Sequence, residues 1–361
     1  MGILGSQDEG QAVPPGRQEE RGESAPVLER APEEKKAASS ARSETLPRRF
    51  GDYLLTSRLG EDCLGRVYRA LSFAEKGEFV RLRVLSSPEL SREALREAAR
   101  KREPEAPSRH RVRGERVGAV DGLPYIAWNE VHGWTLDALL SECRRVGTRL
   151  PLENTLLVAN GITLALDGAR PHGLVWPGFV SIEDDGQVRL AGSGLAAAIL
   201  PSLDRPRLAT SLAPYIAPEA REERVIGRNA DVYSVAVIVL ELLTGWRTPF
   251  PGLGKGLGAG EEFPHELGRL LQVSLAKSRS RLPSVGDFRR ELGKLMVSEN
   301  YRPSSFDFSR YLTNISRGEK ARRNRALAAE TGGEPDHLAF PVLDEVEIDT
   351  VLQKFWGRIE G

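Results

Sequence analysis

DVYSVAVIVLELLTG, residues 231–245, is apolar on nearly every face when it is arranged as a helix. A helix that is apolar all round is buried on all sides, so in a soluble chain it lies at the centre of a helical lobe. The segment is shorter than the roughly 20 apolar residues of a membrane span, and polar residues interrupt it. It therefore predicts the central helix of a large lobe.

Helical spacing of apolar residues continues on both sides of this segment. Upstream, LDALLSECRR (136–145) and LENTLLVANGITLALDGA (152–169) are spaced as helices, and residues 265–295 predict two more. Between them, residues 180–192 predict a β-hairpin, because Asp184-Asp185-Gly186 is a typical hairpin turn. The C-terminal part of the domain is therefore mainly helical with one small hairpin.

The N-terminal part of the domain has the patterns of strands. We expect strands over 50–59, 65–72, 79–85, 112–119 and 124–131, and one helix over 89–103. In FVRLRVL, residues 79–85, apolar side chains alternate with Arg81 and Arg83, so one face of this strand is apolar and the other is cationic. The order predicts an α+β, two-lobed fold with a small β-rich N-lobe, about 50–132, and a larger helical C-lobe, about 133–298.

The two ends of the chain differ from this domain. Residues 1–48 are rich in charged residues, Ser, Pro and Ala and almost free of aromatics, so we expect a disordered tail. Residues 299–361 form a C-terminal extension with two amphipathic segments, 301–315 and 346–359, around a polar, Gly-containing stretch. If the extension docks, Phe355 and Trp356 are the expected anchors.

Composition excludes several classes of function. The 361 residues include 51 Lys+Arg and 51 Asp+Glu, and a net charge of zero argues against nucleic acid as a partner. The two cysteines form neither a disulfide framework nor a zinc pattern. Without a secretory signal or a transmembrane segment, we expect a cytoplasmic protein. Composition predicts no oligomeric state.

Six segments resemble the motifs of a bacterial-type Ser/Thr protein kinase domain, in the same order and spacing. They are LGEDCLGRVYRA (59–70), VRLRVL (80–85), HGLVWPGFVSI (172–182), VRLAGSG (188–194), APYIAPEA (213–220) and residues 231–245. The resemblance covers roughly residues 50–295. It implies a protein-kinase-like domain over 49–298 and a family activity of ATP-dependent phosphoryl transfer.

The resemblance also identifies the positions at which this chain lacks the catalytic groups. Leu174 stands at the catalytic Asp, Trp176 at the Lys that contacts the transferring phosphate, and Phe179 and Gly192 at the two Mg²⁺ ligands. A leucine cannot accept a proton, and neither Phe179 nor Gly192 offers the side-chain oxygen that Mg²⁺ requires. The chain is therefore expected to have no catalytic residue and no metal site.

The nucleotide-binding positions are altered as well. Asp62 replaces the middle glycine of the phosphate-covering loop, Arg83 replaces the strand Lys, and Arg81 replaces the small alanine that packs over adenine. No cofactor is expected, with weak or metal-independent ATP binding left open. The residues that would contact a nucleotide, if one binds, are Gly60, Gly65, Val67, Arg83 and Glu97. Either Glu97 or Asp62 could neutralise the arginines.

Structural residues of the family survive. Glu219 and Arg281 match the ion pair that ends the activation segment, and Asp231 matches the residue that caps the catalytic loop. This selective loss is typical of a pseudokinase, so the preferred hypothesis is a catalytically inactive signalling scaffold or allosteric module that binds a protein partner, such as an active kinase. The alternatives are an unorthodox or residual ATP-dependent Ser/Thr kinase, and a non-catalytic nucleotide or anion sensor that uses Arg81 and Arg83.

Overall fold

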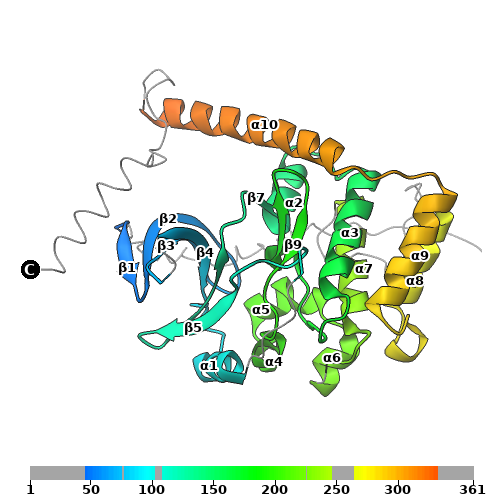
Figure 1. Ribbon diagram of the computed structural model, residues 1–361, viewed down its shortest axis with the longest axis horizontal. Helices are drawn as coiled ribbons and strands as arrows, with labels where there is room; N and C mark the ends of the chain where they lie inside the picture. Colours follow the sequence, from blue (N-terminus) through cyan, green and yellow to red (C-terminus); the bar gives the residue numbers. More distant parts are fainter. Residues whose placement is uncertain (1–44, 75–76, 102–107, 225, 246–263, 332–361) are drawn as a thin grey trace, which may run out of the picture. The chain divides into compact units, whose positions relative to one another are not determined.

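A computed structural model of the chain describes residues 45–74, 77–101, 108–224, 226–245 and 264–331 (Figure 1). Residues 1–44 of the tail expected over 1–48 and the amphipathic segment 346–359 lie outside these residues. The last residue of the expected tail, Arg48, is described and begins a strand, Arg48–Phe50. The part described divides into a sheet lobe followed by a helical lobe, which confirms the two-lobed α+β architecture expected from the sequence.

The N-lobe is a six-stranded antiparallel sheet in the order β1-β2-β3-β4-β6-β5, with helix α1 beside it. Its elements are β1 (Arg48–Phe50), β2 (Tyr53–Glu61), β3 (Arg66–Ser72), β4 (Glu78–Val84), α1 (Arg92–Lys101), β5 (Arg116–Val120) and β6 (Leu123–Asn129). Strand β4 lies between β3 and β6, so its side chains reach both faces at the middle of the sheet.

Alternation along β4 separates two environments. Val80, Leu82 and Val84 pack into an aliphatic and aromatic cluster within the N-lobe. Arg81 and Arg83 therefore point to the opposite face. On that face Trp128 of β6 stands directly across from Arg81, and it belongs to the large core cluster shared with the helical lobe. The cationic face expected from the sequence thus faces the cleft between the lobes.

The C-lobe is built around α7, whose side chains are almost all buried. Its elements are β7 (Gly133–Thr135), α2 (Leu136–Arg145), α3 (Leu152–Leu166), β8 (Val180–Glu183), β9 (Val188–Leu190), α4 (Ala196–Ile199), α5 (Pro206–Ser211), α6 (Pro218–Glu223), α7 (Ala230–Thr244), α8 (His265–Leu275), α9 (Val285–Ser298) and α10 (Ser305–Thr331). Strands β7, β8 and β9 form a small antiparallel sheet that contains the expected hairpin.

The C-terminal extension begins with α10, which runs across the upper edge of the C-lobe in Figure 1. Phe308 and Leu312 of α10 are buried in the C-lobe core. The indole N–H of Trp134 donates to Ser316 Oγ at 3.0 Å, and the Tyr311 hydroxyl lies 3.4 Å from Cys143 Sγ. The first turns of the extension are therefore part of the lobe.

Helix α10 also continues into the polar, Gly-containing stretch as far as Thr331, the last residue that the structure describes. Arg, Lys, Glu and Ala dominate that stretch, and these residues have high helix propensity, which outweighs the single Gly318. None of the helices that the structure describes has the length and hydropathy of a membrane-spanning segment.

Candidate functional site

Arg83 is only 2% exposed and lies between the two lobes, with a partner in each. Its Nη2 atom is 2.8 Å from a carboxylate oxygen of Asp62 in the β2–β3 loop. The same atom donates a hydrogen bond to the backbone oxygen of Gly178 in the C-lobe at 2.9 Å. One buried guanidinium thus ties the glycine-containing loop of one lobe to the catalytic-loop region of the other.

Asp62 also binds the backbone of its own loop. Its Oδ1 atom accepts hydrogen bonds from the N–H groups of Leu64 at 2.9 Å and Gly65 at 3.2 Å. Gly65 is required here, because its φ is +147° and a Cβ atom would lie 2.1 Å from the Val84 oxygen. The N–H groups of Leu64 and Gly65 and the Arg83 guanidinium therefore all contact one anion, the Asp62 carboxylate.

Of the two carboxylates that the sequence offered to neutralise the arginines, Asp62 forms an ion pair with Arg83. Glu97 on α1 matched the family's helix carboxylate, but the described carboxylate that pairs with Arg83 is Asp62. The loop makes this contact possible because it turns back on itself, with the Asp62 N–H donating to the Gly65 oxygen at 2.9 Å. Val67, directly after this loop, stands opposite Arg83 in the β3–β4 register.

Arg81 fills the cleft on the side where the resemblance implies an adenine ring. Its side chain is 9% exposed and donates from Nη2 to the Val131 oxygen at 3.3 Å. Burial lowers the pKa of the Arg81 guanidinium from its ordinary value; the charge of Glu130 opposes this shift and that of Arg83 adds to it. A long, buried cation therefore stands at the position of the family's small alanine.

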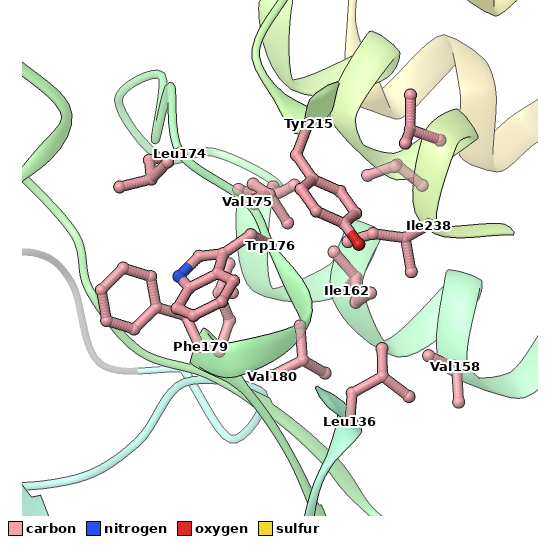
Figure 2. Packing of buried hydrophobic residues seen from close by; sticks show 14 of the residues in the cluster. Leu136, Val158, Ile162, Leu174, Val175, Trp176, Phe179, Val180, Tyr215 and Ile238 are labelled. Atoms are coloured by element: carbon pink, nitrogen blue, oxygen red, sulfur yellow. The ribbon is translucent and has the colours of Figure 1, made fainter. Parts of the chain in front are cut away.

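The residues at the family's catalytic-loop positions are apolar, and two of their rings lie beside Arg83. Leu174, Trp176 and Phe179 are all buried. The rings of Trp176 and Phe179 pack edge to face with their centroids 5.7 Å apart (Figure 2). The Arg83 guanidinium lies 4.9 Å from the Phe179 centroid and 5.6 Å from that of Trp176, so cation–π contacts add to its ionic and hydrogen-bond partners.

Gly192, at the second metal-ligand position, has a backbone that disfavours any side chain. Its φ is +90°, and a Cβ atom would lie 2.7 Å from the ring of Phe179. Its N–H donates to a carboxylate oxygen of Glu115 at 3.1 Å. Over the described ranges, no group of three or more His, Cys, Asp or Glu side chains could hold a metal ion.

The contacts of the structural residues that match the family are present. The Asp231 carboxylate accepts hydrogen bonds from the N–H groups of His172 and Gly173, both at 2.7 Å. Arg281 donates to both carboxylate oxygens of Glu219, one of them at 3.1 Å. Burial alone would raise the pKa of Glu219, but its hydrogen bonds and ion pair with Arg281 bring it below its ordinary value.

Three polar residues of the cleft were not found by sequence reasoning. Arg207 of α5 donates to the backbone oxygen of Asp62 at 2.9 Å. Glu89 accepts from the N–H of Leu208 at 3.0 Å and so holds the start of α5. The third is Glu115. These contacts join residues 77 to 145 positions apart, and no local pattern in the sequence indicates them.

Helix α5 covers the tip of the loop that carries Asp62. Beside it, Cys63 is buried against the activation segment, and burial raises the pKa of its thiol to about 12, against the opposing effect of a hydrogen bond with Ser211. A thiol with so high a pKa stays protonated and has little nucleophilic character. Cys63 therefore fills space in the core and is not a reactive thiol.

Comparison with known proteins gives bacterial Ser/Thr protein kinases as homologues. The chain is 34% identical over 130 residues to the serine/threonine-protein kinase PknL of Mycobacterium tuberculosis, which is 36% of this chain and 32% of PknL. It is 30% identical over 205 residues to PknD of the same organism, which is 54% of this chain and 30% of PknD. The resemblance to this class of protein is thereby confirmed, although the chain spans only about a third of the length of these relatives.

No family model matches the chain. Among solved structures, it is similar to the PknI kinase domain of Mycobacterium tuberculosis, with a TM-score of 0.49 and 22% identity. That match covers 69% of this chain and 98% of the PknI domain.

Proposed function

We propose that this chain is a pseudokinase, a kinase-like domain that transfers no phosphate and acts as a signalling scaffold or allosteric binding module. One observation carries the proposal: the positions of the base and both metal ligands hold Leu174, Phe179 and Gly192. Both side chains are buried, Phe179 packs against Trp176, and a side chain at Gly192 would meet the Phe179 ring.

The expected loss of activity is large. Removing a general base alone typically lowers a rate by ~10²–10⁴-fold. Phosphoryl transfer further depends on metal ions that bridge the phosphates, and these need oxygen ligands. Arg83, which would have to grip the phosphates, is engaged by Asp62 and Gly178. Each of these features opposes phosphoryl transfer independently of the others.

A binding function is supported by what the fold retains. The Glu219–Arg281 pair and the Asp231 contacts hold the activation segment and catalytic loop as in an ordered domain. Arg207 and Glu89 fix α5 across the loop of the N-lobe. We propose that this ordered surface binds a protein, such as an active kinase. A cytoplasmic location belongs to the same proposal and is tested by cell fractionation.

The test is incorporation of radiolabelled phosphate from ATP, with Mg²⁺ and separately with Mn²⁺, into the chain itself and into generic protein substrates. An Arg83→Ala variant purified in the same way is the matched control, because a contaminating kinase would give equal signals in both samples. We expect no incorporation above this control. Mg²⁺-dependent turnover by the natural chain that Arg83→Ala abolishes would refute the proposal and favour a residual kinase.

A further inference from the structure

Helices α8 and α9 lie together in the C-lobe, at the right of Figure 1, and an open groove of about 490 Å³ runs between them. Its floor is apolar and consists of Leu270 and Val273 of α8, Leu282, and Leu295 of α9. Charged residues of the same two helices line its edges. The groove is separate from the site between the lobes, and the proposed function does not use it.

An exposed apolar side chain stands beside this groove. In the described part of the chain the exposed large apolar residues are Leu59, Val146, Val273, Val297 and Phe306. Val273 lines the groove, and Val297 is 83% exposed on α9, one helical turn after Lys294 at the groove's edge. A projection next to a hollow makes a surface that complements itself. If two copies are related by a twofold axis, each Val297 enters the groove of the other copy.

The charges at the edges of the groove also complement themselves. The two helices share a short sequence, ELGRLL in α8 (266–271) and ELGKLM in α9 (291–296), so each carries an acid and, three residues later, a base. Lys294 Nζ lies 2.8 Å from a carboxylate oxygen of Glu291, and Arg269 lies 3.5 Å from Glu266. Antiparallel packing of α9 on α9 of a second copy brings Glu291 opposite Lys294 in both directions. Because these four charges sum to zero, the face does not favour a strongly acidic or basic partner.

Gly293 adds a place where a second helix can approach closely. It lies one turn before Val297 in the interior of α9, where glycine is less favourable than alanine. Nothing lies within 4 Å of its Cβ position, so no contact of the described chain requires glycine there. The missing side chain leaves the α9 backbone open to an approaching helix beside Val297.

We infer that the chain self-associates through this α8–α9 face, with α9 of each copy seated in the groove of the other. The 14 residues of α9 span about 21 Å, and neighbouring helices lie about 10 Å apart, so the face measures about 400 Å². Stable interfaces bury about 800 Å² per partner, so this dimer is weak and depends on concentration. The inference goes beyond the proposed function, because it names a second copy of the chain as a partner of the domain.

The experiment is analytical ultracentrifugation of the full chain from micromolar to submillimolar concentration, without nucleotide or any other protein. We expect the weight-average mass to rise with concentration from 39.7 kDa toward twice that value. Because ATP is absent, the result is independent of whether the chain transfers phosphate.

Variants of exposed residues localise the contact without endangering the fold. Val297→Arg brings a charge into the partner's apolar groove, and we expect it to weaken association at least about tenfold. Val146→Arg, the same change at an exposed valine after α2, should leave association unchanged.

A charge exchange and a glycine variant supply independent readings. Lys294→Glu places carboxylates opposite each other and should weaken association severalfold, whereas Lys294→Glu combined with Glu291→Lys should restore it. Gly293→Ala should weaken association while raising the Tm of the monomer, two changes of opposite sign.

Two results would overturn the inference. Dimers that form equally in the natural chain, Val297→Arg and Lys294→Glu would place the contact on another surface. A mass that stays at 39.7 kDa at every concentration would mean that no second copy enters the groove, and that another occupant, such as segment 346–359 of the same chain, covers it.

Discussion

The Asp62 carboxylate lies 2.8 Å from Nη2 of Arg83 and closes a buried ion pair inside the cleft between the lobes. The same carboxylate accepts two backbone N–H groups of its loop, so it carries three of the interactions that the resemblance would assign to a nucleotide phosphate. Asp62 and Arg83 both belong to the N-lobe, and Arg83 reaches the C-lobe through its hydrogen bond to the Gly178 oxygen. This pair should therefore contribute to stability rather than to catalysis.

Asp62→Asn tests that role. The change leaves the buried Arg83 charge without its partner, and breaking a buried pair in this way costs about 3–5 kcal/mol. We expect the free energy of unfolding in urea to fall by that amount. The control is Asp204→Asn, since Asp204 pairs with Arg224 at the surface with its side chain 82% exposed, and such pairs contribute about 0–1 kcal/mol.

A double variant separates charge from packing at the same site. Arg83→Met in the Asp62→Asn background removes the unpaired cation, and replacing both members of a buried pair is often neutral. We expect most of the lost stability to return. If Asp62→Asn alone left stability unchanged, the pair would be too weak to hold the loop against β4.

Restoring the metal-ligand aspartate should damage the fold and give no gain in activity. In Gly192→Asp the side chain must be accommodated at φ +90°, with its Cβ 2.7 Å from the Phe179 ring. Backbone strain and overpacking together predict a loss of roughly 2–5 kcal/mol, measured by thermal or urea unfolding.

Gly293→Ala provides the matched control for this change. Gly293 lies within α9 with open space around its Cβ position, so alanine there should raise stability by roughly 0.5–1 kcal/mol. A Gly192→Asp variant as stable as the natural chain would show that the Phe179 ring moves aside easily. Room for a metal ligand would then exist.

The fold could be predicted from patterns that depend on near neighbours. Alternation in residues 79–85 indicates β4, the turn at Asp184–Gly186 indicates the β8–β9 hairpin, and the apolar run 231–245 indicates α7. In the strand and the helix, buried apolar residues recur with the period of that secondary structure, so a short window of sequence is enough to identify them. For α10 the apolar pattern indicated only the segment 301–315, because the polar, Gly-containing stretch that follows has no apolar period, although its helix propensity is high.

The site was predictable only in part, for a different reason. The resemblance identified Leu174, Phe179 and Gly192, whose positions are set by spacing along the chain. It offered both Glu97 and Asp62 for Arg83, and only three-dimensional folding of the loop selects Asp62. Arg207 reaches the loop from 145 residues away, so its role depends on tertiary structure alone.

The Glu219–Arg281 pair predicts a pH dependence of stability. Its interactions with Arg281 hold the folded-state pKa of Glu219 below the ordinary value of 4.5, so folding favours the ionised form. The stabilisation is therefore fully present above about pH 5 and is lost as the pH falls through the folded-state value. The stability difference between the natural chain and Glu219→Gln in urea should be largest at about pH 6 and should shrink steadily as the pH is lowered below the ordinary pKa of 4.5. A difference that stayed constant across this range would contradict an ionic contribution.

Two phenylalanines of α10 test whether the residues after 298 belong to the C-lobe. Phe308 is 0% exposed within the lobe core, whereas Phe306, two residues earlier, is 73% exposed. Because Phe308→Ala leaves a cavity, we expect it to lower the free energy of unfolding by about 3–5 kcal/mol. Phe306→Ala removes the same atoms from the surface and should change stability by no more than about 0.5 kcal/mol.

Unfolding in urea, followed by both circular dichroism and tryptophan fluorescence, measures the two effects. Trp134 belongs to the C-lobe and donates to Ser316 of α10, so its fluorescence is sensitive to loss of the contact between the lobe and the helix. If α10 is part of the lobe, Phe308→Ala shifts both signals to the same lower midpoint, since one cooperative unit unfolds. Separate transitions, or equal stability of the two variants, would mean that α10 docks on a lobe that folds without it. In that case α10 could detach, and the surface of the C-lobe beneath it could bind a partner.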